Sequence, residues 1–146
     1  MKSTQVNIAP IACELSHLSV FTTDPNTESQ NTILREDEAF QVRVTIEFGD
    51  SGAIALMPLC LLIEVNFFAE PYGLGPKVEL GNALVNTAAG IFSYSPTLAK
   101  VTPAEIGLSC PGFYQVTAFL RVGAANFPAL IIGLIEGLTI QIYHPS

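Results

Sequence analysis

Within residues 39–48, apolar and polar side chains alternate without a break from Phe40 to Phe48. Side chains on a β-strand point to opposite faces in turn, so this pattern predicts a strand with one buried face and one wet face. Residues 61–70, 113–122 and 138–143 show a similar alternation. Because no stretch keeps a helical period over three turns, the chain is expected to be an all-β domain with little helix.

Weaker strand patterns occur in three further segments, residues 11–21, 78–85 and 91–101. In the first of these the apolar residues change face near His17, and we expect a β-bulge or a kink there. Residues 53–63 are apolar on both faces up to Pro58, which interrupts them. The polar segment 22–38 is long for a loop in a compact domain, and such loops are usually functional or mobile.

About seven strands separated by turn signals are typical of a two-sheet antiparallel β-sandwich. Residues 108–118 resemble the start of strand F in immunoglobulin-like and fibronectin type III-like domains, with Tyr114 following Pro111 and Gly112. The resemblance implies a tyrosine corner, in which the Tyr114 hydroxyl folds back onto the preceding loop. The strand F cysteine of antibody domains falls at Val116, and the chain has no tryptophan. The resemblance therefore implies a sandwich held by apolar packing without that disulfide.

The chain has 146 residues, the length of one domain, and this is enough to close a hydrophobic core. We expect a single immunoglobulin-like sandwich over residues 11–146, preceded by an N-terminal extension of residues 1–10. A jelly roll or a small β-barrel is the alternative architecture.

Hydrophobic residues make up 49% of the chain and charged residues only 13%, against about 25% charged residues in a typical protein. Such a chain either enters a membrane or hides more surface than one folded monomer can. Its longest apolar runs, residues 53–63 and 127–135, are shorter than the roughly 20 residues of a membrane-spanning helix. Residues 1–10 have no apolar core like that of a secretory signal. We expect no membrane insertion and a cytoplasmic location.

The net charge is −7, with only six basic residues. Phosphates need clustered Lys and Arg side chains, so the charge argues against nucleic acid as a partner and equally against anionic lipid surfaces. The three cysteines, Cys13, Cys60 and Cys110, fit no metal-binding spacing, and an odd count is a poor disulfide framework. We expect buried free thiols, with one disulfide among them as the alternative.

Glu36, Asp37 and Glu38 form a short acidic run. With Asp24 or Asp50 these carboxylates could bind calcium, because hard cations need several oxygen ligands. The run lacks the ordered spacing of a calcium-binding loop. We favour an exposed acidic edge that blocks strand-to-strand aggregation, and we expect neither a metal nor another cofactor.

Acid–base and nucleophilic catalysis usually recruit histidine, paired carboxylates or an activated nucleophile. The two histidines are His17, in the first predicted strand, and His144, close to the end of the sequence. For neither does the sequence place a Ser or Cys that suggests a catalytic dyad. We expect no catalytic residues and a protein that is not an enzyme.

In the immunoglobulin-like order, strands C, F and G share one sheet. Their outward positions carry large apolar side chains, and the interface candidates among them are Leu62, Phe68, Phe113, Phe119 and Tyr143. Together these side chains could form a patch at or above the roughly 300–600 Å² found on ordinary monomers. The alternative is that loops or the N-terminal segment cover this face.

These observations favour a non-enzymatic structural or protein–protein interaction module that self-associates or docks into a larger assembly. Its partner would be another copy, in a homo-oligomer or filament, or another protein. The alternative is a β-sandwich that binds a sugar, a lipid or a metal ion in a pocket lined by Tyr72, Tyr94 and the loop at residues 70–76.

Overall fold

The computed structural model describes residues 11–22, 31–109, 111–124 and 129–145. This part of the chain is mostly β, with one short α-helix and one 3₁₀ turn. The strands form two sheets, which confirms the prediction of a two-sheet β fold with little helix. In chain order the elements are β1 (Ala12–Thr22), β2 (Ile33–Arg35), β3 (Phe40–Gly49), α1 (Asp50–Leu56), η1 (Met57–Leu59), β4 (Leu62–Pro71), β5 (Val78–Asn86), β6 (Ser93–Tyr94), β7 (Gly112–Gly123) and β8 (Ile131–Tyr143).

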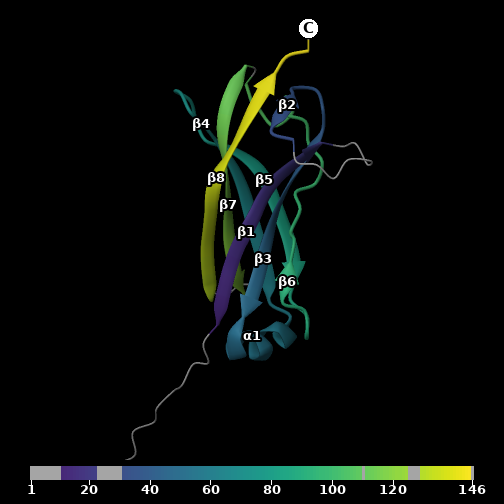
Figure 1. Ribbon diagram of the computed structural model, residues 1–146, viewed down its shortest axis with the longest axis vertical. Helices are drawn as coiled ribbons and strands as arrows, with labels where there is room; N and C mark the ends of the chain where they lie inside the picture. Colours follow the sequence, from purple (N-terminus) through teal and green to yellow (C-terminus); the bar gives the residue numbers. More distant parts are fainter. Residues whose placement is uncertain (1–10, 23–30, 110, 125–128, 146) are drawn as a thin grey trace, which may run out of the picture.

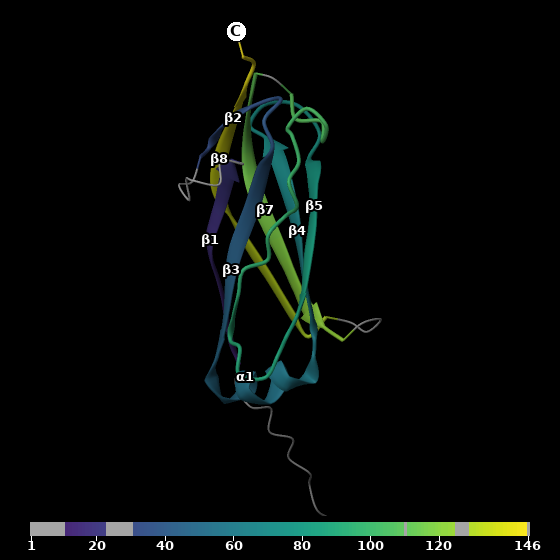
Figure 2. The same cartoon turned by 90° about the vertical axis from the view of Figure 1, so that its right-hand side faces the viewer.

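The smaller sheet has the strand order β1-β3-β6, and the larger sheet has the order β2-β8-β7-β4-β5. All neighbouring strands are antiparallel except β2 and β8, which run parallel. β4, β7 and β8 are neighbours in the larger sheet, as predicted for the strands with outward apolar residues. The strands run along the length of the molecule, and α1 lies at the end opposite the C-terminus (Figure 1 and Figure 2).

The core lies between the two sheets. β3 keeps its predicted alternation, because Val42, Val44 and Ile46 are fully buried while Arg43 and Thr45 between them are half-buried. β4 and β7 contribute equally regular sets of buried side chains from the larger sheet. A fully buried Val, Ile or Phe side chain contributes about 1.5–3 kcal/mol relative to an exposed one, so these two inner faces hold the sheets together.

β1 contains the bulge that the sequence predicts. Its register against β3 shifts between Ser16 and Ser19, and His17 has a left-handed backbone with φ 52°. The core-facing residues of β1 are at odd-numbered positions before the bulge, as for Leu15, and at even-numbered positions after it, as for Leu18. Without the extra residue one of these two leucines would point to solvent, so the bulge keeps both against the core.

Two strands differ from their predictions. Of the expected strand at residues 91–101, only β6 is regular, and Thr97 and Val101 add isolated bridges to β3. Pro96 lies in the middle of this segment and has no N–H to donate to a ladder, so regular pairing stops there. The last strand, β8, begins at Ile131, whereas the sequence prediction begins it at residue 138.

Residues 53–63 form most of α1 and η1, which lie at one end of the two-sheet fold with Ala53 and Met57 buried. The polar segment 22–38 contains the short strand β2. Residues 23–30 of that segment and the predicted N-terminal extension lie outside the described residues. Within the described ranges, no helix has the length and apolar character needed to cross a membrane.

Tyr114 ties the loop before β7 to the sheet. Its side chain is buried, with 4% exposed. Its hydroxyl oxygen accepts a hydrogen bond from the backbone N–H of Ser109, with 2.7 Å between nitrogen and oxygen. This is the contact that a tyrosine corner requires.

Cys13 and Cys60 are free cysteines. Cys13 is half-buried, and its burial raises the pKa of the thiol. Cys60 is exposed, so the expectation of a buried thiol is wrong for this residue. The cause is local, because Cys60 ends η1 in a left-handed turn with φ 54° before β4 begins. Cys110 lies outside the described residues.

Candidate interaction surface on the larger sheet

The outer face of the larger sheet carries all five interface candidates. Leu62 and Phe68 lie on β4, Phe113 and Phe119 on β7, and Tyr143 on β8. Phe113 and Tyr143 are 54% and 37% exposed, and the other three are half-buried. A buried residue precedes or follows each of the five in its strand, so all of them point away from the core.

These five side chains do not form one patch. The register places Phe68 and Phe119 at diagonal positions on neighbouring strands, about 7–8 Å apart. Phe113 and Tyr143 lie at the other end of the sheet, where β2 joins it. These two pairs are separated by the polar side chains of Gln115, Thr117 and Thr139. Leu62 lies apart from both pairs, at the opposite end of β4 from Phe68.

Phe68 is partly covered by its own chain. Nζ of Lys77 lies 4.4 Å from the centroid of the Phe68 ring. This cation–π contact places an ammonium group over one face of the ring. Phe68 therefore offers less apolar surface to a partner than the sequence suggests.

Sequence reasoning missed an exposed apolar group on the same face. Ile132 and Leu134 of β8 are 64% and 56% exposed. The register places Leu134 opposite Phe119, and Leu130, which is 63% exposed, immediately precedes β8. We call Phe119, Leu130, Ile132 and Leu134 the β8 cluster.

The alternation of β8 is hidden in the sequence because residues 127–135 are apolar on both faces. Gly133, on the inner face, lets β1 approach closely. A Cβ atom added to Gly133 would lie 2.6 Å from Cδ1 of Leu15 in β1. A glycine inside an apolar run is the signal that could have revealed this arrangement, because such glycines often mark the close approach of another element.

β8 is also an open edge of the larger sheet. β7 pairs with it over residues 131–142. On the other side of β8, β2 pairs with residues 141–143 alone, as far as the described residues show. Figure 1 shows β8 at one side of the molecule, with the short β2 near its end. Residues 131–140 thus present a strand edge without a ladder partner in the described part of the chain.

The ligand pocket expected between Tyr72 and Tyr94 does not form. Tyr94 is buried at the α1 end of the molecule, where its hydroxyl contacts the sulfur of Met57. Tyr72 follows β4 at the opposite end. A shallow pocket of about 310 Å³ lies between the loop after β4 and the loop before β7, and neither tyrosine lines it.

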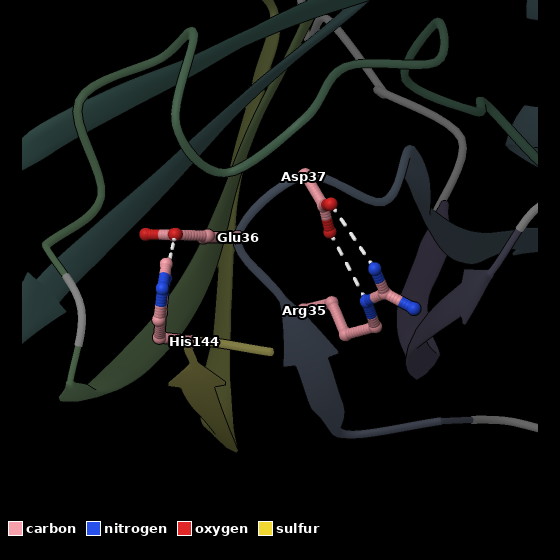
Figure 3. A network of polar contacts seen from close by, with 4 residues as sticks. All are labelled: Arg35, Glu36, Asp37 and His144. Carbon is pink, nitrogen blue, oxygen red and sulfur yellow. Dashed lines mark hydrogen bonds and ion pairs between the residues drawn. The ribbon is translucent and has the colours of Figure 1, made fainter. Parts of the chain in front are cut away.

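The three residues of the acidic run contact different partners and do not converge on one site. Asp37 accepts hydrogen bonds from Nε and Nη2 of Arg35, both at 3.1 Å, and these bonds lower the pKa of the Asp37 carboxyl. Glu36 pairs with Nδ1 of His144 (Figure 3). Glu38 closes a turn through its backbone, whose N–H donates to the carbonyl of Arg35.

The remaining candidates for a metal or catalytic site lie elsewhere. Asp50 begins α1 at the far end of the molecule, and Asp24 lies outside the described residues. The described residues hold no group of three or more His, Cys, Asp and Glu side chains that could bind a metal ion. His17 lines an open pocket with Arg43 and several hydroxyl groups, and neither a carboxylate nor Cys13 is among the residues of that pocket.

Neither a protein-family model nor a curated protein sequence matches this chain. Among solved structures, beta-glucosidase from Listeria innocua resembles it in complexes with glucose and with gluconolactone, with TM-scores of 0.47 and 0.48 and identities of 15% and 14%. These matches cover 94% of this chain and 17% of the beta-glucosidase chain. AggA, the major subunit of aggregative adherence fimbriae type I from Escherichia coli, has a TM-score of 0.45 and 8% identity, covering 92% of this chain and 96% of AggA. These likenesses are too distant to support a function.

Proposed function

We propose that this protein is a non-enzymatic structural or protein–protein interaction module with an immunoglobulin-like sandwich, and that it self-associates through the larger sheet. The observation that carries the proposal is the β8 cluster, which lies beside residues 131–140 of β8, an edge without a ladder partner among the described residues. Single exposed apolar side chains are ordinary, whereas a contiguous group of them marks an interaction site. The apolar edge next to the group supports the proposal further, because edges of this kind recruit further strands.

The charge distribution supports a second copy as the partner. A chain with a net charge of −7 repels its own copies, so self-association needs a contact surface with little charge. Residues 130–135 carry no charged side chain. Arg121, which is opposite Ile132, has the oppositely charged Glu64 across from it on β4. Two copies can therefore meet at the β8 cluster without bringing like charges together.

The β8 cluster needs additional surface to form a stable contact. A standard interface buries about 800 Å² on each partner, and four side chains supply only part of that area. Leu62 of β4 is an outward neighbour on the same sheet, and it lies opposite Gly123 of β7. Leu62 and the backbone edge of β8 extend the apolar surface.

The surroundings of the histidines support the non-enzymatic part of the proposal. His17 is exposed, and its Nδ1 contacts the hydroxyl of Ser16 at 3.0 Å. His144 is exposed and paired with Glu36. Neither arrangement, within the part of the chain that the structure describes, joins a nucleophile, a base and an orienting group in one pocket.

Light scattering behind a sizing column tests self-association. We expect the wild-type protein at micromolar concentration to have at least the mass of a dimer. Phe119→Asp places a charge in the β8 cluster, so we expect a folded protein by circular dichroism with the mass of a monomer. Phe113→Asp is the matched control at the other end of β7 and should keep the wild-type mass. A monomeric wild type contradicts the proposal.

A further inference from the structure

We propose that β8 pairs with β8 of a second copy in antiparallel orientation, about a two-fold axis that runs perpendicular to the sheet between the two Gly133 residues. The two larger sheets would then join into one continuous sheet. This inference rests on the proposed self-association and names the segment and the register through which it occurs.

The β8 edge lacks the features that normally protect a strand edge. Natural edge strands carry lysine, proline, inward charges or bulges that prevent further pairing. Residues 130–135 contain no charged residue and no proline. Two other edge strands carry such features, since β1 has the bulge at His17 and β2 is followed by the acidic run.

A bulge ends the regular part of the unpaired β8 segment on its C-terminal side. The register between β7 and β8 shifts after Ile135, so that β8 has one residue more than β7 before Leu138. Gly137 takes up this residue with φ 108°. Regular pairing with a second copy therefore ends at Ile135, and successive side chains of residues 130–135 alternate between the two faces.

This stretch is complementary to itself. A two-fold axis at Gly133 places Ile132 of one copy opposite Leu134 of the other on the outer face. On the inner face the same axis places Ile131 opposite Ile135. Cross-strand apolar pairs of this kind are the unit that stabilises a sheet. Moving the axis to Ile132 sets Ile131 opposite a glycine, and moving it to Leu134 sets Ile132 opposite Glu136, so the register centred on Gly133 is the best matched.

The same register keeps like charges apart. Glu136 of one copy lies opposite Leu130 of the other. The two Glu136 positions are six residues apart along the pair, or roughly 20 Å, which exceeds the Debye length of about 8 Å at physiological salt. A basic partner would find no acidic side chain within residues 130–135. The segment thus fits a second copy of this chain better than a partner of opposite charge.

A pair of charge substitutions tests the register. Ile132→Lys and Leu134→Glu change exposed side chains, so both variants should fold. In each variant alone, both outer pairs of the dimer set a charge opposite an apolar side chain, so we expect Kd to rise at least about tenfold. In an equimolar mixture, the introduced lysine faces the introduced glutamate across one pair, and the other pair is again isoleucine with leucine. We expect the mixture to recover dimers as hetero-pairs in sedimentation velocity.

The outcomes separate this inference from the proposed function. The proposed register is overturned if the wild type dimerises, each single variant is monomeric and their mixture stays monomeric as well. Single variants that dimerise like the wild type place the interface elsewhere and overturn the use of β8, while self-association stands. A monomeric wild type overturns both. Ile54→Lys on α1, where Ile54 is 67% exposed, is the control for an added surface charge and should leave Kd unchanged.

Discussion

One hydrogen bond joins the loop before β7 to the sheet, from the Ser109 N–H to the Tyr114 hydroxyl. Tyr114→Phe keeps the buried ring and removes the acceptor alone. We expect the unfolding free energy to fall by about 1–3 kcal/mol, because the N–H loses its partner in a partly buried place. Chemical denaturation followed by circular dichroism measures the change.

Tyr72→Phe is the control for removing a tyrosine hydroxyl. Tyr72 is 60% exposed, and its hydroxyl bonds to Oγ1 of Thr139 at the surface. Loss of this surface contact should change the unfolding free energy by about 0.5 kcal/mol or less. If Tyr114→Phe and the wild type unfold at the same denaturant concentration, the tyrosine corner contributes nothing to stability and its assignment falls.

The direction of single side chains could be predicted from sequence, but their neighbours could not. Phe113 and Phe119 were placed on the outer face from the period of two along the strand. Their distance from other candidates depends on the register between strands and on the bulge before Leu138, which set Leu134 opposite Phe119. Nothing in the pattern of one strand fixes its register with the next strand. The candidates predicted as one patch therefore lie at separate places on the sheet.

At the scale of the element, β4 allows a clean comparison of its two faces. Phe67 is fully buried and its neighbour Asn66 is half-buried on the outer face. Phe67→Ala removes a ring from the core and should lower the unfolding free energy by about 3–5 kcal/mol. Asn66→Ala should change it by about 0.5 kcal/mol or less. Similar losses for the two variants in denaturant titrations would contradict the assignment of the faces.

Elements with strict alternation were predicted well, and elements apolar on both faces were not. β3 and β7 follow the period of two because one face meets the core and the other meets water. The first part of β8 meets β1 on its inner face, yet its outer face is also apolar, so the alternation vanishes. In the predicted strand at residues 91–101, the cause of the error was Pro96, whose missing N–H outweighed the apolar pattern.

For the whole molecule, the type of contact decides between a closed dimer and a filament. Pairing of β8 with itself uses the same surface on both copies, so the assembly closes at two. A filament would need β8 of one copy to meet a different edge, such as β5, on the next copy. We therefore expect a dimer whose mass stays constant as the protein concentration rises further.

Amide hydrogen exchange as a function of protein concentration tests the central claim most directly, because it reports both association and its location. We expect the amides of residues 131–135 that point to the open edge of β8, which alternate with those that point to β7, to exchange markedly more slowly at high concentration than at low concentration, because a second strand would bond to them. The amides of α1 should exchange at the same rate under both conditions. Exchange at residues 131–135 that does not depend on concentration, in samples where light scattering detects a dimer, would contradict the account.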